Sequence, residues 1–302
     1  MQRVLNRRGY TLIELLVAVV LLGIVSAALY RVLANNQRLY MAQTQRIDLS
    51  QNIRAAISIL PTELRELSAS EGDIGFPLQA LSSTRIDIRA MRWLGFVCKP
   101  PVLGGGALNG LDMVIRGGTV GQPMFYGRDI RNSDSLLIYY DGNQATRTDD
   151  FWAWARINAS PSNDACLDGK PGQRLVFDIF PPSFLGPNIA GAITNGAPVR
   201  GFARVSYQLY QPAGDTSSYL GYQPANGTLQ PLMGPVLPGN GVQFTYFDSL
   251  GAVTANRLRI ARIDIAVRAR TSAPVRTGGQ GPLRAIVDSV STSVSLRNNR
   301  RF

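Results

Sequence analysis

An apolar run near the start of this 302-residue sequence constrains its fold more than any other feature. The run covers residues 15–29 and contains no charged side chain. With Leu12, Ile13, Val32 and Leu33 it reaches about 20 residues, and a helix of that length, rising about 1.5 Å per residue, crosses the hydrocarbon core of a bilayer. The run therefore predicts one membrane-spanning helix.

A short basic leader precedes the apolar run. Its charged residues are Arg3, Arg7 and Arg8. Because positive charge keeps a flanking segment in the cytoplasm, the sequence predicts a cytoplasmic amino terminus and an exported carboxy-terminal part. We expect the chain to cross the membrane once.

Glu14 is an acidic residue directly before the apolar run. A carboxylate at the centre of a membrane helix costs about 2.5 to 3.5 kcal/mol, so this one needs a partner or a shallow position. If the chain were cut between Gly9 and Tyr10, the new α-amino group would lie about one helical turn from Glu14. In an assembly, the amine of one subunit could meet the carboxylate of its neighbour and set the register between apolar helices.

A six-residue motif spans the junction between leader and apolar run. Its residues are Gly9, Tyr10, Thr11, Leu12, Ile13 and Glu14. Behind an arginine-rich leader, the motif resembles the prepilin processing and methylation motif of type IV pilins and type II secretion pseudopilins. The resemblance implies that prepilin peptidase cleaves after Gly9 and methylates Tyr10, and that Glu14 guides subunit addition. It also implies a single-pass location in the bacterial inner membrane, with the carboxy-terminal domain in the periplasm, followed by incorporation into a pilus or pseudopilus.

Two features distinguish this sequence from the usual pattern. Tyrosine stands at position 10, where phenylalanine is usual, and no proline occurs between Tyr10 and Leu60, where major pilins carry helix-bending prolines. The second feature favours a minor pilin.

A conventional secretory signal ending near residues 26–28, Ser-Ala-Ala, is the alternative. That alternative leaves Glu14 unexplained and discards the helix.

Two short stretches near the carboxy terminus are similar to PilW-like minor pilins and J-type pseudopilins. They are residues 241–248 and residues 294–298. This similarity ranks a PilW-like minor pilin of a type IV pilus first, at or near the fibre tip where it helps to start assembly, and a J-type pseudopilin second. The expected partners are prepilin peptidase, other pilin or pseudopilin subunits and inner-membrane lipid. A membrane-anchored binding protein or adhesin stays open as another class.

The helical pattern continues beyond the membrane segment. Apolar residues recur in steps of three and four along one face, at Ile53, Ile57, Leu60, Leu64 and Leu67. A helix of roughly 50 residues, about 75 Å long, is expected, with Pro61 either starting a new turn or ending the helix. Its amphipathic half should pack on a sheet that buries Ile53, Ile57 and Leu60.

From about residue 72 the sequence changes to short β-like runs separated by glycine, proline, asparagine and serine. The candidate strands are residues 135–140, 174–180, 202–209, 242–247, 260–270 and 287–296. In the fifth candidate strand, Ile263, Ile265 and Val267 alternate with the residues between them, as in an antiparallel strand with one solvent-exposed face. Residues 248–251, Asp-Ser-Leu-Gly, predict a hairpin connection.

The expected fold class is α+β, a type IV pilin-like fold with a long helix packed on an antiparallel sheet domain. The expected domains are a leader at residues 1–9, a transmembrane and assembly helix at 10–33, its amphipathic continuation at 34–70 and an exported β-rich domain at 71–302.

The two cysteines, Cys98 and Cys166, could pair in an exported domain or stay as buried thiols. An aromatic cluster at Phe151, Trp152 and Trp154 is interpreted as core packing or a loop anchor rather than a ligand site.

Composition narrows the possible activities. Histidine is absent, which excludes Ser-His-Asp and Cys-His nucleophile arrangements, and the two cysteines lack metal-ligand spacing. Lys and Arg exceed Asp and Glu by 31 to 20, yet the basic residues are spread along the whole chain. We therefore expect no enzyme activity, no cofactor, no metal and no specific nucleic-acid partner.

Overall fold

A computed structural model describes most of the chain. The described residues are 11–65, 67, 78–101, 110–124, 126–132, 134–141, 145–146, 151–180, 192–276 and 281–296. The leader and the cleavage residues Gly9 and Tyr10 lie outside them. The chain divides into two compact units, one formed by Met1–Gln51 with Thr271–Ile286 and the other by Asn52–Arg270 with Val287–Phe302.

One helix, α1 (Leu12–Arg65), contains 54 residues, so it is about 80 Å long. Pro61 lies inside the helix. The prediction that Pro61 begins a new turn or ends the helix is therefore wrong, because α1 continues through it for one further turn. The helix ends at Arg65, within the segment 34–70 expected as its amphipathic continuation.

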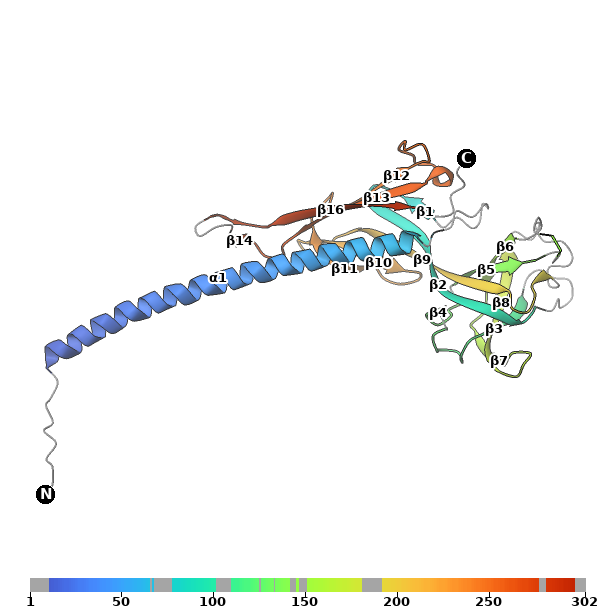
Figure 1. Cartoon of the computed structure of the whole chain (residues 1–302), viewed down its shortest axis with the longest axis horizontal. Helices are drawn as coiled ribbons and strands as arrows, with labels where there is room; N and C mark the ends of the chain where they lie inside the picture. Colours follow the sequence, from blue (N-terminus) through green and yellow to red (C-terminus); the bar gives the residue numbers. More distant parts are fainter. Residues whose placement is uncertain are drawn as a thin grey trace, which may run out of the picture. The chain divides into compact units, whose positions relative to one another are not determined.

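The first unit joins the first part of α1 to a short hairpin. The hairpin strands are β14 (Val275–Arg276) and β15 (Leu283–Arg284), which pair antiparallel. The Gln45 side-chain oxygen accepts hydrogen bonds from the Ser272 hydroxyl at 2.8 Å and from the Ala273 backbone N–H at 3.2 Å. These bonds tie the hairpin to the helix, beside which β14 lies in Figure 1.

The second unit contains a large antiparallel sheet, which confirms the expected α+β class. Among the described residues its strands are β1 (Leu78–Leu81), β2 (Arg85–Lys99), β3 (Leu111–Arg116), β4 (Tyr126–Gly127), β5 (Ser135–Tyr140), β6 (Phe151–Ile157), β7 (Ser162–Ala165), β8 (Pro171–Phe180), β9 (Pro198–Tyr210), β10 (Ser218–Pro224), β11 (Gln230–Val236), β12 (Val242–Phe247), β13 (Arg262–Arg270) and β16 (Val287–Ser295). The expected strands β5 and β12 have the predicted bounds. The other four expected strands are present with ends shifted by one to four residues.

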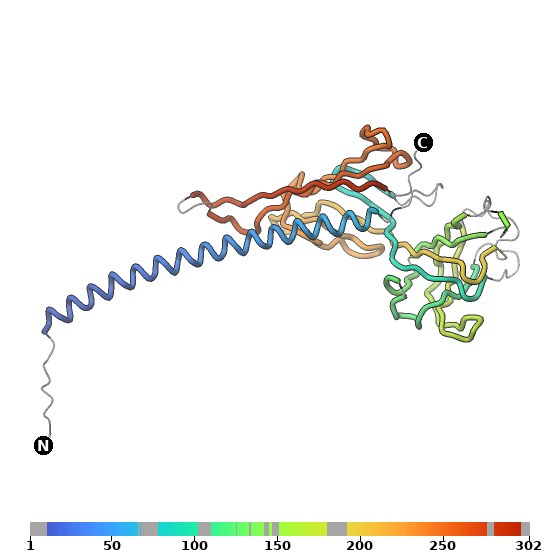
Figure 2. Tube along the Cα trace, in the orientation of Figure 1, coloured from blue at the N-terminus to red at the C-terminus, as the bar shows by residue number. Residues whose placement is uncertain are grey.

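Part of this sheet closes on itself. Among the described strands, β2 pairs with β3, then β8, β6, β5 and β9 follow in order, and β9 pairs back with β2. The circuit is a small barrel, which removes the exposed strand edges of an open sheet. Strands β2 and β9 run side by side into it, as Figures 1 and 2 show.

The barrel interior is filled by apolar side chains around Trp93. Its indole N–H donates to the buried carboxylate of Asp134 at 2.9 Å, and Arg128 forms an ion pair with the same carboxylate. Gly201 on β9 is the cross-strand partner of Trp93, and a Cβ at this position would lie 1.9 Å from the Trp93 ring. The close approach of ring and backbone therefore requires glycine at this position.

Beyond β9 the sheet continues as an open part in the order β10, β11, β13 and β12, and β16 also pairs with β13. The short strands β1 and β4 pair with β2, and β7 pairs with β8. In β13, Ile263, Ile265 and Val267 are buried, which confirms the predicted alternation. The last turns of α1 contact the second unit's sheet, because the Asn52 amide donates to the Gly234 carbonyl of β11 at 2.9 Å. Glu63 of α1 pairs with Arg92 of β2 at 2.7 Å.

The amphipathic face of α1 is buried largely as predicted. Ile53, Leu60 and Leu64 are buried, as is Leu67 beyond the helix end. Ile57 is only half-buried, so the prediction for this side chain is wrong. Ala56 lies deeper, at 1% exposure, because the contact line follows residues 53, 56, 60 and 64 rather than residue 57.

The predicted turn at residues 248–251 forms, and it lies in the connection between β12 and β13, which pair antiparallel. The Gly251 N–H donates to the Asp248 carbonyl at 3.2 Å, and Gly251 has a φ of 83°. The chain then continues through a short 3-10 helix, η2 (Arg257–Arg259), before β13 begins at Arg262. The hairpin prediction is therefore confirmed, because the turn lies in the connection between two antiparallel neighbours and an antiparallel bridge joins Phe247 to Val253 on its two sides. The connection is longer than the turn alone.

A disulfide joins Cys98 near the end of β2 to Cys166 in the turn between β7 and β8. Both sulfur-bearing residues are buried and pack with Val114. The Leu167 N–H donates to the Cys98 carbonyl at 3.3 Å, which adds a backbone contact beside the bond. The β7–β8 hairpin is thereby fixed to the barrel.

The aromatic cluster lies neither in the core nor in a loop. It belongs to β6, where Ala153 and Ala155 point into the barrel and Trp152 and Trp154 point outward. Arginine side chains stack on both indoles, Arg200 on Trp152 at 4.5 Å and Arg89 on Trp154 at 4.2 Å. The interpretation as core packing or a loop anchor is wrong, because alternation along the strand places the large rings outside.

Candidate assembly site at the start of the helix

The first turn of α1 is closed by reciprocal hydrogen bonds between Thr11 and Glu14. The Thr11 backbone N–H and hydroxyl each donate to Oε2 of Glu14 at 3.2 Å. In return, the Glu14 N–H donates to the Thr11 hydroxyl at 3.3 Å. This is a capping box, in which a threonine cap and a glutamate three residues later satisfy each other's backbone N–H groups.

The capping box gives Glu14 a local structural role that the sequence interpretation missed. The signal was present, since threonine followed three residues later by glutamate, ahead of an apolar run, is the signature of this motif. Both bonds from Thr11 reach the same oxygen, Oε2. Among the described residues no donor reaches Oε1, so this oxygen can accept from a group outside the helix.

The carboxylate also lies at the favourable end of the helix. The aligned peptide dipoles give the first turn a partial positive charge, which stabilises an anion there by about 0.3 to 1 kcal/mol at an exposed site. Glu14 is thus held by Thr11 and by the helix itself. The remaining cost of placing it at a membrane surface is smaller than for an unsupported carboxylate.

The apolar side chains that follow Glu14 have no cover within the chain. Every leucine, isoleucine and valine side chain between Leu12 and Leu33 is at least half exposed. The helix is long and apolar enough to span a membrane, and no charged residue lies between Glu14 and Arg31. A surface of this kind needs lipid or neighbouring apolar helices around it.

The predicted site residues are distributed as follows. Thr11 and Glu14 meet in the capping box, and Leu12 and Ile13 lie exposed beside them. Gly9 and Tyr10 precede the described residues, so their roles stay predictions. Within the described part of the chain, no group of three or more acidic, cysteine or histidine side chains could hold a metal ion.

Comparison with protein-family models matches residues 5–30 to the prokaryotic N-terminal methylation motif. The match covers the end of the leader, the six-residue junction and the apolar run. Comparisons with curated proteins and with solved structures gave no match. The chain therefore carries a prepilin-type methylation motif at the start of an apolar helix.

The motif supports a type IV pilin or pseudopilin that is a substrate of prepilin peptidase and assembles with other subunits of this class. The exposed apolar helix is consistent with membrane anchoring followed by incorporation into a fibre. The methylation motif therefore indicates a structural subunit.

Proposed function

We propose that this chain is a PilW-like minor pilin of a type IV pilus, stored in the inner membrane and incorporated at or near the fibre tip to help start assembly. Prepilin peptidase cuts after Gly9 and methylates the amino group of Tyr10. The observation that carries the proposal is the methylation motif at residues 5–30, which includes the start of a helix whose apolar side chains have no cover within the chain.

Glu14 supplies the polar contact in this assembly. After cleavage, the α-amino group of Tyr10 is a cation at the start of the helix, four residues before Glu14. When helices bundle, the amine of one subunit donates to the free Oε1 of its neighbour while Oε2 stays bonded to Thr11. Because both charges are poorly solvated beside lipid, a mismatched register leaves them unpaired, which favours one register.

The exported location of the second unit is supported by the Cys98–Cys166 bond, because disulfides persist in oxidising compartments such as the periplasm. The helix carries no proline before Pro61, which fits a minor subunit better than a major one.

The test separates the charge of Glu14 from its capping role. Glu14→Gln keeps a capping box, since glutamine also serves at this position, but removes the charge. Thr11→Val removes the hydroxyl of the box and keeps the carboxylate. We expect Glu14→Gln to insert in the membrane normally and to be absent from sheared pili, and Thr11→Val to be incorporated, with a helix start weaker by about 1 kcal/mol.

Asp48→Asn is the matched control, because Asp48 is an exposed carboxylate on the same helix beyond the apolar run. It should be incorporated like the unmodified chain. Normal incorporation of Glu14→Gln, or equal loss in Thr11→Val and Glu14→Gln, would show that the charge does not direct assembly.

A further inference from the structure

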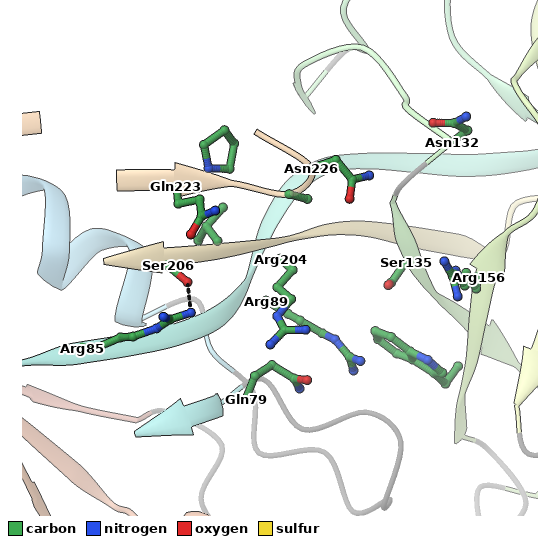
Figure 3. Close-up of a pocket in the computed structure, with 14 residues that line it drawn as sticks. Gln79, Arg85, Arg89, Asn132, Ser135, Arg156, Arg204, Ser206, Gln223 and Asn226 are labelled. Carbon is green, nitrogen blue, oxygen red and sulfur yellow. Dashed lines mark hydrogen bonds between the residues drawn. The ribbon is translucent and has the colours of Figure 1, made fainter. Parts of the chain in front are cut away.

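A basic pocket lies on the outer face of the second unit, between β2, β9, β6 and the β10–β11 turn (Figure 3). Its volume is about 810 Å³, within the range of ligand sites in proteins. Four arginines line it, Arg85, Arg89, Arg156 and Arg204. None of the described residues that line the pocket is acidic.

Strand pairing forces two of these cations together. Arg89 of β2 and Arg204 of β9 are direct cross-strand partners and lie side by side in the centre of Figure 3. Like charges in this relation destabilise a sheet. Burial and the charge of Arg204 lower the pKa of Arg89 to about 10, so it is still a cation at neutral pH. The register of β2 and β9 therefore concentrates positive charge at the pocket.

Among the described residues, the carboxylate that pairs with these arginines does not neutralise the pocket. Asp87 is buried beneath it and is held by Arg85 through bonds of 2.7 and 3.0 Å. Arg204 is 3.6 Å from the same carboxylate but keeps 62% of its side chain exposed. Arg156 is exposed as well. Both guanidinium groups therefore have donors that face the pocket.

The rest of the lining indicates what kind of anion fits. Asn132, Gln223 and Asn226 bring amide groups, which donate and accept hydrogen bonds, and Figure 3 places them around the arginines. Asn226 has a φ of 59°, a conformation that asparagine tolerates, at the tip of the β10–β11 turn. Trp154 adds an aromatic wall. Amides suit sugar hydroxyls, while guanidinium groups bind carboxylates in a two-pronged geometry.

We propose that this pocket binds a carboxylated saccharide, one or two uronic-acid units of a longer chain, with Arg156 and Arg204 on the carboxylate and the amides on the hydroxyls. A nucleic acid fits less well. Proteins bind nucleic acids through basic stripes that follow the phosphate backbone, whereas these arginines surround one cavity. The inference goes beyond assembly and does not depend on Glu14, so the two proposals fail separately.

The test uses the full-length protein in detergent micelles and isothermal titration calorimetry. The probe is a tetramer of galacturonic acid, with a neutral glucose tetramer and a five-nucleotide thymidine strand as comparisons. The uronate tetramer should bind and the neutral tetramer should not. Each Arg→Gln change should weaken uronate binding about tenfold or more, since it removes a charge-assisted hydrogen bond.

The variants are Arg156→Gln alone and Arg156→Gln with Arg204→Gln. The single change involves a side chain outside the Asp87 pair, so it keeps the test valid if the double variant folds poorly. Arg259→Gln is the control, because Arg259 is exposed and outside the pocket. Uronate binding no stronger than that of the neutral sugar, binding unaffected by Arg156→Gln, or equally tight binding of the thymidine strand would each overturn the proposal.

Discussion

Reduction of the Cys98–Cys166 bond should lower the stability of the second unit by about 4 kcal/mol. The two residues are 68 positions apart, and in the chain-entropy model a loop of that length corresponds to about 4 kcal/mol at 25 °C. The bond fixes the β7–β8 hairpin to the end of β2, so its loss leaves the unfolded chain less restricted without removing any strand from the barrel.

Urea unfolding, followed by tryptophan fluorescence with and without a reductant, measures this effect. With a urea dependence of about 2 to 3 kcal/mol per M, the midpoint should fall by about 1.5 to 2 M on reduction. The variant Cys98→Ala with Cys166→Ala should unfold near the reduced midpoint and respond to no reductant. A midpoint that moves by less than about 0.3 M on reduction would refute the argument, because the cross-link would then restrict little of the unfolded chain.

Gly201→Ala should destabilise the barrel by about 1 to 3 kcal/mol or more in the same urea assay, because its Cβ would overlap the Trp93 ring, and an unchanged midpoint would contradict this packing. Asp87→Asn should remove an acid-dependent loss of stability. Burial alone would raise the pKa of Asp87, but hydrogen bonds from Arg85 and Ser206 lower it below its ordinary value. The stability that ionised Asp87 contributes is therefore complete above about pH 4 and is lost as the pH falls through the folded-state pKa of Asp87. The thermal midpoints of the unmodified protein and of Asp87→Asn should accordingly converge in acid. Thermal midpoints that move further apart in acid would contradict a lowered pKa for Asp87.

Local patterns predicted the elements that depend on neighbouring residues. The apolar run and the three-four spacing gave α1, and alternation gave the buried face of β13. In β6 the same period of two was present, with tryptophan and alanine alternating, and it would have placed Trp152 and Trp154 outside the barrel. Treating the aromatic residues as a cluster hid that period.

Other features depend on pairing between distant segments, which no local pattern specifies. The barrel closes because β2 pairs with β3 at one end and with β9 along its length. Strand β2 is buried at many consecutive positions, so it lacks a clean alternation and was not predicted. The arginines of the pocket lie far apart in the sequence, and Arg89 meets Arg204 only through the register of β2 and β9.

Mass spectrometry of the mature amino terminus, on protein purified from the membranes of cells that express the native chain, determines whether prepilin peptidase processes this protein. We expect a chain that begins at Tyr10 with a methylated α-amino group and retains the whole of α1. A chain that still begins at Met1, or one that begins near Ala28 without its apolar helix, would contradict this expectation.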